Sequence, residues 1–486
     1  MARLFFPLAL SVCLGVAALA ALMLERQSTG LATGEIRAAG TPVTVLMPEG
    51  QTSPPLVVIA HGYGGSRQMM RPIALTLARA GFAAASFDFH GHGRHTEPMA
   101  GDVTAIDGTT EQLVRQTLAV TEALAARPDL GPPVALIGHS MATDIVVRAA
   151  ERRGDGAAVI AVSMYSDAVT QTHPARLLVI SGEYENRLRE IALDRVHQVD
   201  PTAAEGELAR AGEVSRQAIY APWAGHVGVL YAPTTLVAVR DWLEGAATPL
   251  PSHGFWLVVL LGAVLASAWP LSRLVLPDAP PEAAAPLSRR DLALVILAPL
   301  PVALGAAALV PTAALGLAGF GPLTAFFGAW GLVQGGILLA RGATTGGLSA
   351  PALLLMLAWG LGAFALALDR YGAAFLPSGP RFGAMGLLLL GTLPFALAEG
   401  LLARVARWPT RYLAKFLVLA TLLAMLFVVP GTAPAFTVLP VLVLFWAVYG
   451  AVGYLMAARA GPLGPGLALG VILAWALAAS TPLIAA

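Results

Sequence analysis

The pattern of apolar and polar residues divides the chain into two parts with different periodicity. Between residues 55 and 245, short apolar runs alternate with amphipathic stretches. Continuous apolar strands separated by helices are typical of a parallel sheet that is covered by helices on both faces. The predicted strands are Leu56–Ala60, Phe82–Phe87, Val134–Gly138, Ala158–Ser163, Leu177–Ser181 and Gln217–Tyr220, and the predicted helices are Gln68–Ala80, Thr110–Ala126, Met141–Arg153 and Thr234–Leu243.

The rest of the chain consists mainly of long apolar runs. Residues 4–24 carry no charge, and a helix of roughly 20 residues spans a bilayer core of about 30 Å. We predict a signal anchor here. The alternative is a cleaved signal peptide, because Ala18-Leu19-Ala20 resembles a cleavage site. Eight further spans are predicted after Pro251, at about residues 255–272, 292–310, 322–340, 349–368, 383–403, 413–430, 437–457 and 464–484.

The basic residues predict an orientation for these spans. If the N-terminus is cytoplasmic, the segments on that side carry Arg273, Arg289, Arg290, Arg341, Arg404, Arg407, Arg411, Lys415 and Arg459. The opposite loops of the second half carry Arg370 and Arg381. An excess of Lys and Arg marks the cytoplasmic side. We therefore predict a multi-pass plasma-membrane protein in which residues 1–25 are the anchor, residues 26–250 form an extracytoplasmic domain, and residues 251–486 form an all-α transmembrane bundle.

Composition supports this division. The chain is 57% hydrophobic and 12% charged, with a net charge of +1, which argues against a basic nucleic-acid-binding surface. Residues 1–253 carry 19 basic and 24 acidic side chains, whereas residues 254–486 carry 11 and 5. All nine histidines lie in the first part. Chemistry is therefore expected there, and Cys13 as the single cysteine excludes an intramolecular disulfide.

A candidate nucleophile follows the strand predicted at Val134–Gly138. The sequence Gly138-His139-Ser140-Met141-Ala142 lies between this strand and a predicted helix. That context is required for a nucleophile elbow, a sharp turn that exposes a serine hydroxyl at the carboxyl end of a sheet. Ala142 stands where the motif usually has glycine.

Complementary residues follow other predicted strands. His61-Gly62-Tyr63-Gly64-Gly65 comes after the first strand, and the backbone N–H groups of Tyr63 and Met141 could form an oxyanion hole. His226 follows the last strand and is the predicted general base. The acid that orients it is predicted to be Glu185, with Asp167 and Glu183 as alternatives.

This order of serine, acid and histidine resembles the α/β-hydrolase superfamily, over about residues 55–245. The matching residues are His61-Gly62, Gly81-Phe82, Asp88, Gly91, Gly93 and Gly138–Met141. They are most similar to the monoacylglycerol-lipase and serine-aminopeptidase-like branch. Ala142-Thr143 replaces two glycines, Glu185 replaces the usual aspartate, and the family's cap after Ala158–Ser163 is missing, as in dienelactone hydrolases.

The resemblance implies an α/β-hydrolase domain acting as a serine esterase without a cofactor. The expected substrate is a small-molecule or lipid ester, and the expected partners are membrane lipids, with no nucleic acid. A peptidase or acyltransferase with the same triad is an alternative. So is a transport or scaffold protein with an inactive hydrolase-like domain.

Three other features have structural interpretations. His90, His92 and His95 could suggest a metal site, but we expect loop residues instead. The charged residues 186–214 predict one or two solvated helices, with a flap over the site as the alternative. Glu399, inside a predicted span, is expected to reach toward Arg404 and Arg407 at its end.

Overall fold

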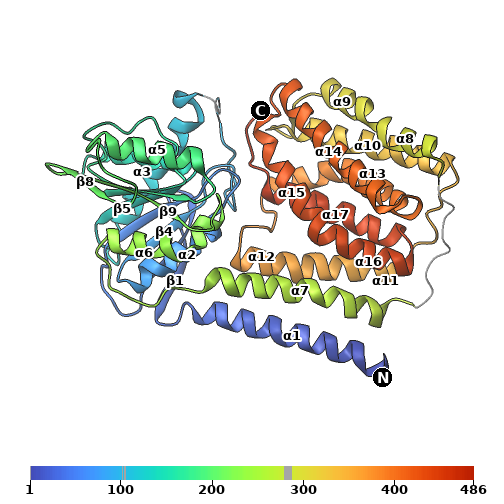
Figure 1. Cartoon of the computed structure of the whole chain (residues 1–486), viewed down its shortest axis with the longest axis horizontal. Helices are drawn as coiled ribbons and strands as arrows, with labels where there is room; N and C mark the ends of the chain where they lie inside the picture. Colours follow the sequence, from blue (N-terminus) through green and yellow to red (C-terminus); the bar gives the residue numbers. More distant parts are fainter. Residues whose placement is uncertain (1, 101, 103–104, 278–286) are drawn as a thin grey trace. The chain divides into compact units, whose positions relative to one another are not determined.

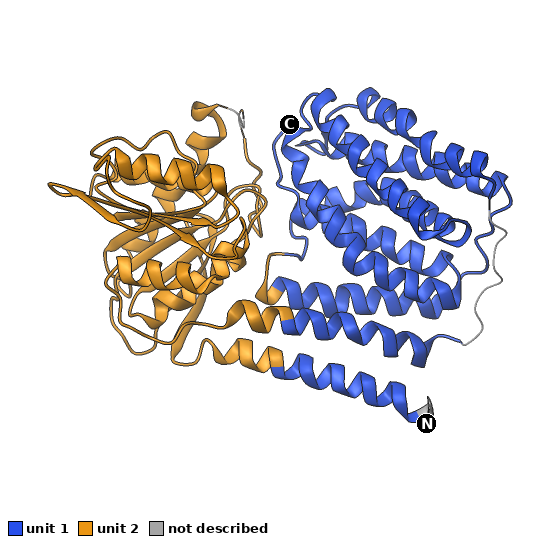
Figure 2. Cartoon of the chain, viewed as in Figure 1, with its two compact units in different colours: residues 1–19, 259–369, 375–486 blue, residues 20–258, 370–374 orange. Residues whose placement is uncertain are grey.

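The computed structural model describes residues 2–100, 102, 105–277 and 287–486. They form two compact units (Figure 2). Unit 2, drawn in orange, comprises residues 20–258 and 370–374, and unit 1, drawn in blue, comprises residues 1–19, 259–369 and 375–486.

Unit 2 is built on a nine-stranded sheet with the order β1-β2-β4-β3-β5-β6-β7-β9-β8. Neighbouring strands from β4 to β9 in this order run parallel, as predicted for continuous apolar strands. The six predicted strands are confirmed as β3 (Leu56–Ala60), β4 (Ala83–Phe87), β5 (Pro133–His139), β6 (Ala158–Val162), β7 (Arg176–Gly182) and β9 (Val214–Ala221).

Sequence analysis missed a hairpin at one edge of the sheet. Strands β1 (Leu31–Ala38) and β2 (Thr41–Pro48) precede the first predicted strand, and β2 pairs antiparallel with β4. Ala39 and Gly40 form the two-residue turn, with φ of 47° and 78°. Positive φ at both turn residues is the geometry that matches the twist of a hairpin. Ala-Gly is a weaker turn signal than Asn-Gly, which explains the omission.

Helices cover both faces of this sheet, as predicted. Figure 1 shows α2 (Arg71–Arg79) and α6 (Pro233–Trp242) on one face and α3 (Glu111–Ala125) and α5 (Asn186–His197) on the other, and α4 (Ala142–Arg153) packs against α3. The core joins the strands to α2 and α6 through fully buried side chains, among them Val57, Ile59, Leu75, Leu77, Ile137, Ile160, Ile180, Leu236 and Val239. Burial of this apolar surface is the main force that holds the layers together.

The charged stretch 186–214 is only partly helical. Its first half forms α5, but its second half contains β8 (Leu208–Ala211), which pairs antiparallel with β9 and closes the sheet at that edge. The prediction of one or two helices was therefore wrong for the second half. Gly212 adopts φ of 58° in the tight turn between β8 and β9, a conformation that favours a hairpin over a continued helix.

Segments from distant parts of the chain belong to unit 2. The end of α1 (Ala2–Arg26) contributes Glu25, whose carboxylate accepts hydrogen bonds from Arg370 at 2.7 Å and from the Tyr371 hydroxyl at 2.6 Å. His253 Nε2, at the start of α7 (His253–Val275), donates to the Tyr371 carbonyl at 2.7 Å. The Ala374 N–H donates to Ser66 Oγ at 2.9 Å. Residues 370–374 are thus tied to the loop that follows β3.

Unit 1 is helical. Among the described residues, nine helical segments of the whole chain are long and apolar enough to cross a membrane. After α1 and α7 these segments are Arg289–Leu309 (α8 and α9), Phe320–Ala340 (α10), Ala350–Tyr371 (α11 to α12), Arg381–Val405 (α13), Trp408–Val428 (α14), Ala433–Ala460 (through α15 and α16) and Leu463–Ser480 (α17). Each predicted span lies on one of them. The last helix ends at Ser480, before the predicted residue 484, because Pro482 cannot continue a helix.

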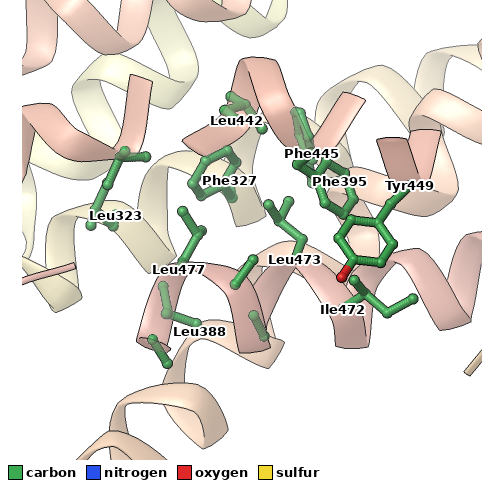
Figure 3. Close-up of a cluster of buried hydrophobic side chains, with 14 of the residues drawn as sticks. Leu323, Phe327, Leu388, Phe395, Leu442, Phe445, Tyr449, Ile472, Leu473 and Leu477 are labelled. Atoms are coloured by element: carbon green, nitrogen blue, oxygen red, sulfur yellow. The ribbon is translucent and has the colours of Figure 1, made fainter. Parts of the chain in front are cut away.

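The core of unit 1 lies between α10, α13, α15 (Val438–Phe445) and α17 (Figure 3). Leu323 and Phe327 of α10, Phe395 of α13, Leu442 of α15 and Leu473 of α17 are buried together. A Cβ atom at Gly331 or Gly391 would overlap the backbone of the facing helix, so these glycines allow α10 and α13 to approach closely.

Glu399 of α13 has partners other than those expected. Its carboxylate lies 3.4 Å from Lys415 Nζ and accepts a hydrogen bond from Trp446 Nε1 at 2.9 Å. Arg404 donates instead to the Thr344 carbonyl at 3.2 Å. The expectation that Glu399 reaches toward Arg404 and Arg407 was wrong, because Lys415, about two turns into α14, lies beside the Glu399 carboxylate.

Candidate active site

Ser140 lies in a sharp turn between β5 and α4. Its φ of 52° is in the left-handed region, which is rare for residues other than glycine and is the strained conformation expected of a nucleophile elbow. The Ser140 N–H donates to the Val162 carbonyl at 2.9 Å, which holds the turn against β6. A Cβ atom at Gly138 would lie 2.5 Å from the Ala142 carbonyl oxygen, so the strand and the helix meet closely here. Ala142, which replaces the usual glycine, is fully buried in this contact.

The structure brings Ser140, His226 and Glu185 together from three loops. His226 Nε2 lies 2.9 Å from Ser140 Oγ, and His226 Nδ1 lies 2.5 Å from Glu185 Oε1. Because the carboxylate can only accept, Nδ1 carries the proton and Nε2 presents its lone pair to the serine hydroxyl. This is the arrangement in which a histidine can remove the proton of a serine.

Glu185 is held as an anion by donors that the sequence did not reveal. Its Oε2 accepts hydrogen bonds from the Gly182 N–H at 2.6 Å and from Ser163 Oγ at 2.7 Å. Burial alone raises the pKa of this carboxyl, but the hydrogen bonds from His226, Gly182 and Ser163 outweigh it and leave the pKa below its usual value. Ser163, with φ of 54°, is turned toward the carboxylate at the end of β6. The sequence placed Ser163 at the end of an apolar strand, and this position was the signal that it could lie near the site.

The two alternative acids do not reach His226. Glu183 accepts a hydrogen bond from the Trp223 N–H at 2.6 Å, so it fixes the loop that leads to the histidine. Asp167 is exposed on the segment after β6. Of the three predicted carboxylates, Glu185 is therefore the one bonded to the imidazole.

The loop after β3 lies directly against the serine. A Cβ atom at Gly62 would lie 3.0 Å from Ser140 Cβ, so glycine is needed for this approach. Tyr63, the next residue, packs its ring edge-to-face on His92 at 5.4 Å between centroids. Met141 is the N-cap of α4, where backbone N–H groups are available to an anion. The two predicted oxyanion residues thus lie on the two segments that meet at Ser140.

A buried ion pair supports the loops around the site. Asp88, which has no exposed surface, lies 2.8 Å from the guanidinium of Arg67 and also accepts hydrogen bonds from the Arg67 and Arg94 N–H groups. Asp88 therefore joins the loop after β4 to the loop after β3. Gly93, with φ of 51°, packs on this carboxylate so closely that a side chain would overlap it.

The three histidines of the loop after β4 contact one another, and the His90 and His95 rings lie 4.2 Å apart. His92 Nδ1 donates to the His90 carbonyl at 2.8 Å, and His95 Nδ1 accepts from the Glu97 N–H at 3.1 Å. Burial lowers the pKa of His95 to about 4, with His90 nearby adding to the effect. Within the described residues, no group of three or more His, Cys, Asp or Glu side chains is arranged to hold a metal ion.

Four exposed apolar side chains lie on the loops that carry or adjoin the triad residues, and they were not predicted. Trp223 is 83% exposed on the loop that leads to His226. Val227, which directly follows His226, is also exposed. The exposed Tyr184 directly precedes Glu185. The exposed Tyr165 follows β6, and its carbonyl accepts a hydrogen bond from the hydroxyl of Thr143, three residues after Ser140. Soluble surfaces seldom gather large apolar side chains without a ligand or partner to cover them. In the sequence, each of these four apolar residues lies in or next to a loop that carries a triad residue, and this was the signal that could have identified them.

Comparison with known proteins agrees with this description of the fold. The family model described as serine aminopeptidase, S33, matches residues 52–191, which include β3 to β7 and the turn at Ser140. Unit 2 has the α/β-hydrolase fold. The predicted fold class was an α/β-hydrolase domain plus an all-α transmembrane bundle. The mostly parallel sheet with helices in the α/β-hydrolase fold is confirmed, and so is a C-terminal helical region with several long apolar helices.

Several solved structures are similar to the α/β-hydrolase domain. One is a dienelactone hydrolase from Anabaena variabilis, at 19% identity over 44% of this chain and 94% of that one, with a TM-score of 0.32. Another is Est1E from Butyrivibrio proteoclasticus with bound ferulic acid, at 17% identity over 43% and 97% of the two chains, with a TM-score of 0.33. A search of the curated proteins found no match.

Proposed function

We propose that this protein is a membrane-bound serine hydrolase that cleaves acyl esters. The observation that carries the proposal is the pair of contacts at His226, 2.9 Å to the Ser140 hydroxyl and 2.5 Å to the Glu185 carboxylate. A hydroxyl with a neutral imidazole at hydrogen-bond distance, itself oriented by a carboxylate, is the basis of an activated serine. The fold supplies the turn that such a serine requires.

In the proposed first step, Ser140 Oγ attacks the acyl carbon while His226 Nε2 takes the hydroxyl proton. The electron pair of the C=O bond moves to the carbonyl oxygen, and the N–H groups of Tyr63 and Met141 are proposed to donate to this oxyanion. Glu185 stabilises the imidazolium through Nδ1–H. The C–O bond to the alcohol then breaks, His226 returns its proton to the leaving oxygen, and an acyl-enzyme remains.

In the second step, water replaces the alcohol. His226 Nε2 removes a proton from the water as its oxygen attacks the acyl carbon, and the bond to Ser140 Oγ breaks as the serine recovers a proton. The products are a carboxylic acid and the free enzyme.

The substrate class that we propose is an ester with an apolar acyl chain. Trp223, Tyr165, Tyr184 and Val227 offer exposed apolar surface on the loops that carry or adjoin the triad. Covering this surface with an acyl chain removes apolar area from water, which contributes roughly 25 cal/mol per Å². Such binding favours lipid-like esters over small polar ones.

We further propose that the nine long apolar helices cross the plasma membrane and that residues 26–250 are extracytoplasmic. The support is the length and hydropathy of the nine segments, and the excess of basic residues in the segments assigned to the cytoplasmic side.

A peptidase activity is the second candidate, because the matching family model is described as a serine aminopeptidase. The same triad would attack an amide, with an amine as the leaving group. Ester and amide substrates with the same acyl group, offered with water, alcohol and amine acceptors, separate esterase, peptidase and acyltransferase activity by their products.

The test is labelling of the purified full chain with a fluorophosphonate probe, which reacts with activated serines. We expect labelling of the wild type and none in Ser140→Ala or His226→Ala, since loss of either group typically costs about 10⁶ in turnover. Ser53→Ala, on a surface turn that contacts Pro128, is the matched control and should label like the wild type. A folded wild type that is not labelled would overturn the proposal and favour the scaffold alternative.

A further inference from the structure

One buried hydroxyl group joins the turn at Ser140 to the segment that follows β6. Thr143 has no exposed surface, and its hydroxyl donates to the Ser140 carbonyl at 2.7 Å. The Tyr165 carbonyl shares this proton at 3.1 Å, and the Tyr165 N–H donates to Thr143 Oγ1, also at 3.1 Å. The backbones of Ser140 and Tyr165 are thus bonded to one oxygen atom. Removing that atom would leave backbone groups of both residues without this partner, which costs free energy.

The segment that carries Tyr165 is bonded at both of its ends. Before it, Ser163 Oγ donates to the triad carboxylate of Glu185 at 2.7 Å. After it, Ser166 Oγ donates to Asp144 Oδ1 at 2.7 Å. Asp144 belongs to α4, the helix that begins at the nucleophile turn. The backbone of Tyr165 is therefore fixed relative to the nucleophile turn and to the triad acid.

The side chain of Tyr165 is exposed although its backbone is fixed. It is 65% exposed, whereas the neighbouring Met164 has no exposed surface. A rigid aromatic side chain offers a large contact area and loses little conformational freedom when a ligand covers it. Thr143 stands where the family that the sequence resembles has glycine, and glycine has no hydroxyl to make these bonds. The fixed position of Tyr165 thus depends on a residue that is particular to this chain.

The order of the strands places Tyr165 opposite the loop that carries Tyr63. Ser140 follows β5, which lies between β3 and β6 in the sheet. Tyr63 follows β3 and Tyr165 follows β6, so the two loops flank the turn from opposite sides. In the first step proposed above, the oxyanion faces the Tyr63 N–H and the leaving oxygen faces His226 Nε2. This leaves the side of the loop after β6 for the acyl chain.

We propose that Tyr165 selects the acyl group of the ester and that Thr143 is the positioning residue that holds it. A long acyl chain covers more of the fixed ring than an acetyl group does, and the apolar area removed from water favours the longer ester. Without the Thr143 hydroxyl the segment can move, and the ring no longer has a set position beside the serine. The proposal rests on the serine hydrolase activity proposed above.

The experiment compares p-nitrophenyl octanoate with p-nitrophenyl acetate as substrates of the purified full chain in one detergent. The measured quantity is the ratio of their kcat/KM values, which does not depend on how much of the enzyme is folded. We expect the wild type to favour the octanoate and Tyr165→Ala to lower the ratio about tenfold. Tyr165→Phe keeps the ring and should keep the ratio. A wild type that favours the acetate, or a ratio unchanged in Tyr165→Ala, would overturn the proposal.

The role of the Thr143 hydroxyl has its own variants. Thr143→Val keeps the shape of the side chain and should lower the ratio about three- to tenfold, the worth of one hydrogen bond, whereas Thr143→Ser keeps the hydroxyl and should preserve the ratio. Thr121→Val is the matched control. Thr121 is equally buried, and its hydroxyl donates to the Thr117 carbonyl at 2.7 Å within α3, which carries no triad residue. An unchanged ratio in Thr143→Val, or an equal fall in Thr121→Val, would refute the positioning role.

A double variant tests whether Thr143 acts through Tyr165. If it does, Thr143→Val combined with Tyr165→Ala should have the ratio of Tyr165→Ala alone, because the residue that is held is gone. Losses that multiply would refute this link. Fluorophosphonate labelling separates these outcomes from failure of the hydrolase proposal. A wild type that is neither labelled nor active contradicts both proposals, whereas a labelled wild type whose variants keep its ratio contradicts only the roles of Tyr165 and Thr143.

Discussion

His139, the residue before the candidate nucleophile, donates a hydrogen bond from Nε2 to the backbone carbonyl of His226 at 2.8 Å. The rings of the two histidines lie 5.0 Å apart. His139 is 4% exposed, so its ring is packed in the interior. It also fixes the backbone of the residue that would act as general base, which makes it a positioning residue.

This contact predicts a pH dependence of stability. Burial, together with the nearby His226, lowers the pKa of His139 to about 4 from its ordinary 6.5. Above pH 6.5 the group is neutral in both folded and unfolded states. Between pH 6.5 and about 4 only the unfolded chain binds the proton. The free energy of unfolding therefore falls on acidification by up to about 1.4 kcal/mol per pH unit.

Thermal unfolding between pH 7.5 and 4.5 measures this effect. His139→Gln keeps a donor for the His226 carbonyl but has no titrating ring. We expect its melting temperature to fall less steeply with decreasing pH than that of the wild type. If both proteins lose stability with the same slope, His139 does not have the assigned role.

The choice of acid can be tested with three isosteric variants. Glu185→Gln keeps the shape of the side chain but removes the charge that stabilises the imidazolium. We expect fluorophosphonate labelling to slow about 10³- to 10⁴-fold. Glu183→Gln and Asp167→Asn should label within a few-fold of the wild-type rate. A large loss in either of these, with Glu185→Gln near normal, would assign the acid elsewhere.

Two glycines beside the site should respond differently to substitution. In Gly62→Ala the new Cβ would lie 3.0 Å from Ser140 Cβ and 2.9 Å from His139 Nδ1, so one of the two loops must move. We expect slower labelling and a loss of about 1–3 kcal/mol in stability. Gly225→Ala, next to His226, meets no atom within 4 Å and should change stability by less than about 0.5 kcal/mol. Equal effects would contradict the close approach at Gly62.

The buried pair of Asp88 and Arg67 should be important for stability. Asp88→Ala leaves the buried Arg67 guanidinium with the exposed Glu35, at 3.4 Å, as its remaining carboxylate partner. Loss of a buried partner typically costs about 3–5 kcal/mol, and Glu35 places the expected cost toward the lower end. Glu111→Ala is the comparison, because its pair with Arg152 is solvent-exposed and such pairs contribute less than about 1 kcal/mol. Chemical denaturation followed by tryptophan fluorescence compares the two, and similar losses would refute the role assigned to Asp88.

Membrane orientation can be measured with single cysteines. In a Cys13→Ala background, Glu49→Cys adds a thiol to the exposed turn directly after β2, and Arg407→Cys adds one at the start of α14. We expect an impermeant maleimide to label residue 49 in intact cells and residue 407 only after permeabilisation. The reverse pattern would show that the predicted orientation is inverted.

Much of the fold could be predicted because it depends on local pattern. The buried strands of the sheet are continuous apolar runs, and the long helices are apolar over their whole length, so each is visible in a short window of sequence. Strands β1 and β8 lie at the two sheet edges, where they are only partly buried and the pattern is weak. Strand β2 is mostly buried, but it is joined to β1 by a turn with a weak sequence signal. Their pairing with β4 and β9 decided their structure.

In the candidate site, too, local sequence predicted some features and only tertiary contacts decided others. The sequence by itself determined the turn at Ser140, the position of His226 after the last parallel strand, and the loop at Gly62, because each follows directly from a strand end. Only the tertiary structure decided between Glu183 and Glu185, which are two residues apart in one turn and differ in which partner they meet. It alone brought Ser163 to the carboxylate and tied residues 370–374 to Ser66, because those contacts join segments that are distant in sequence and leave no local pattern.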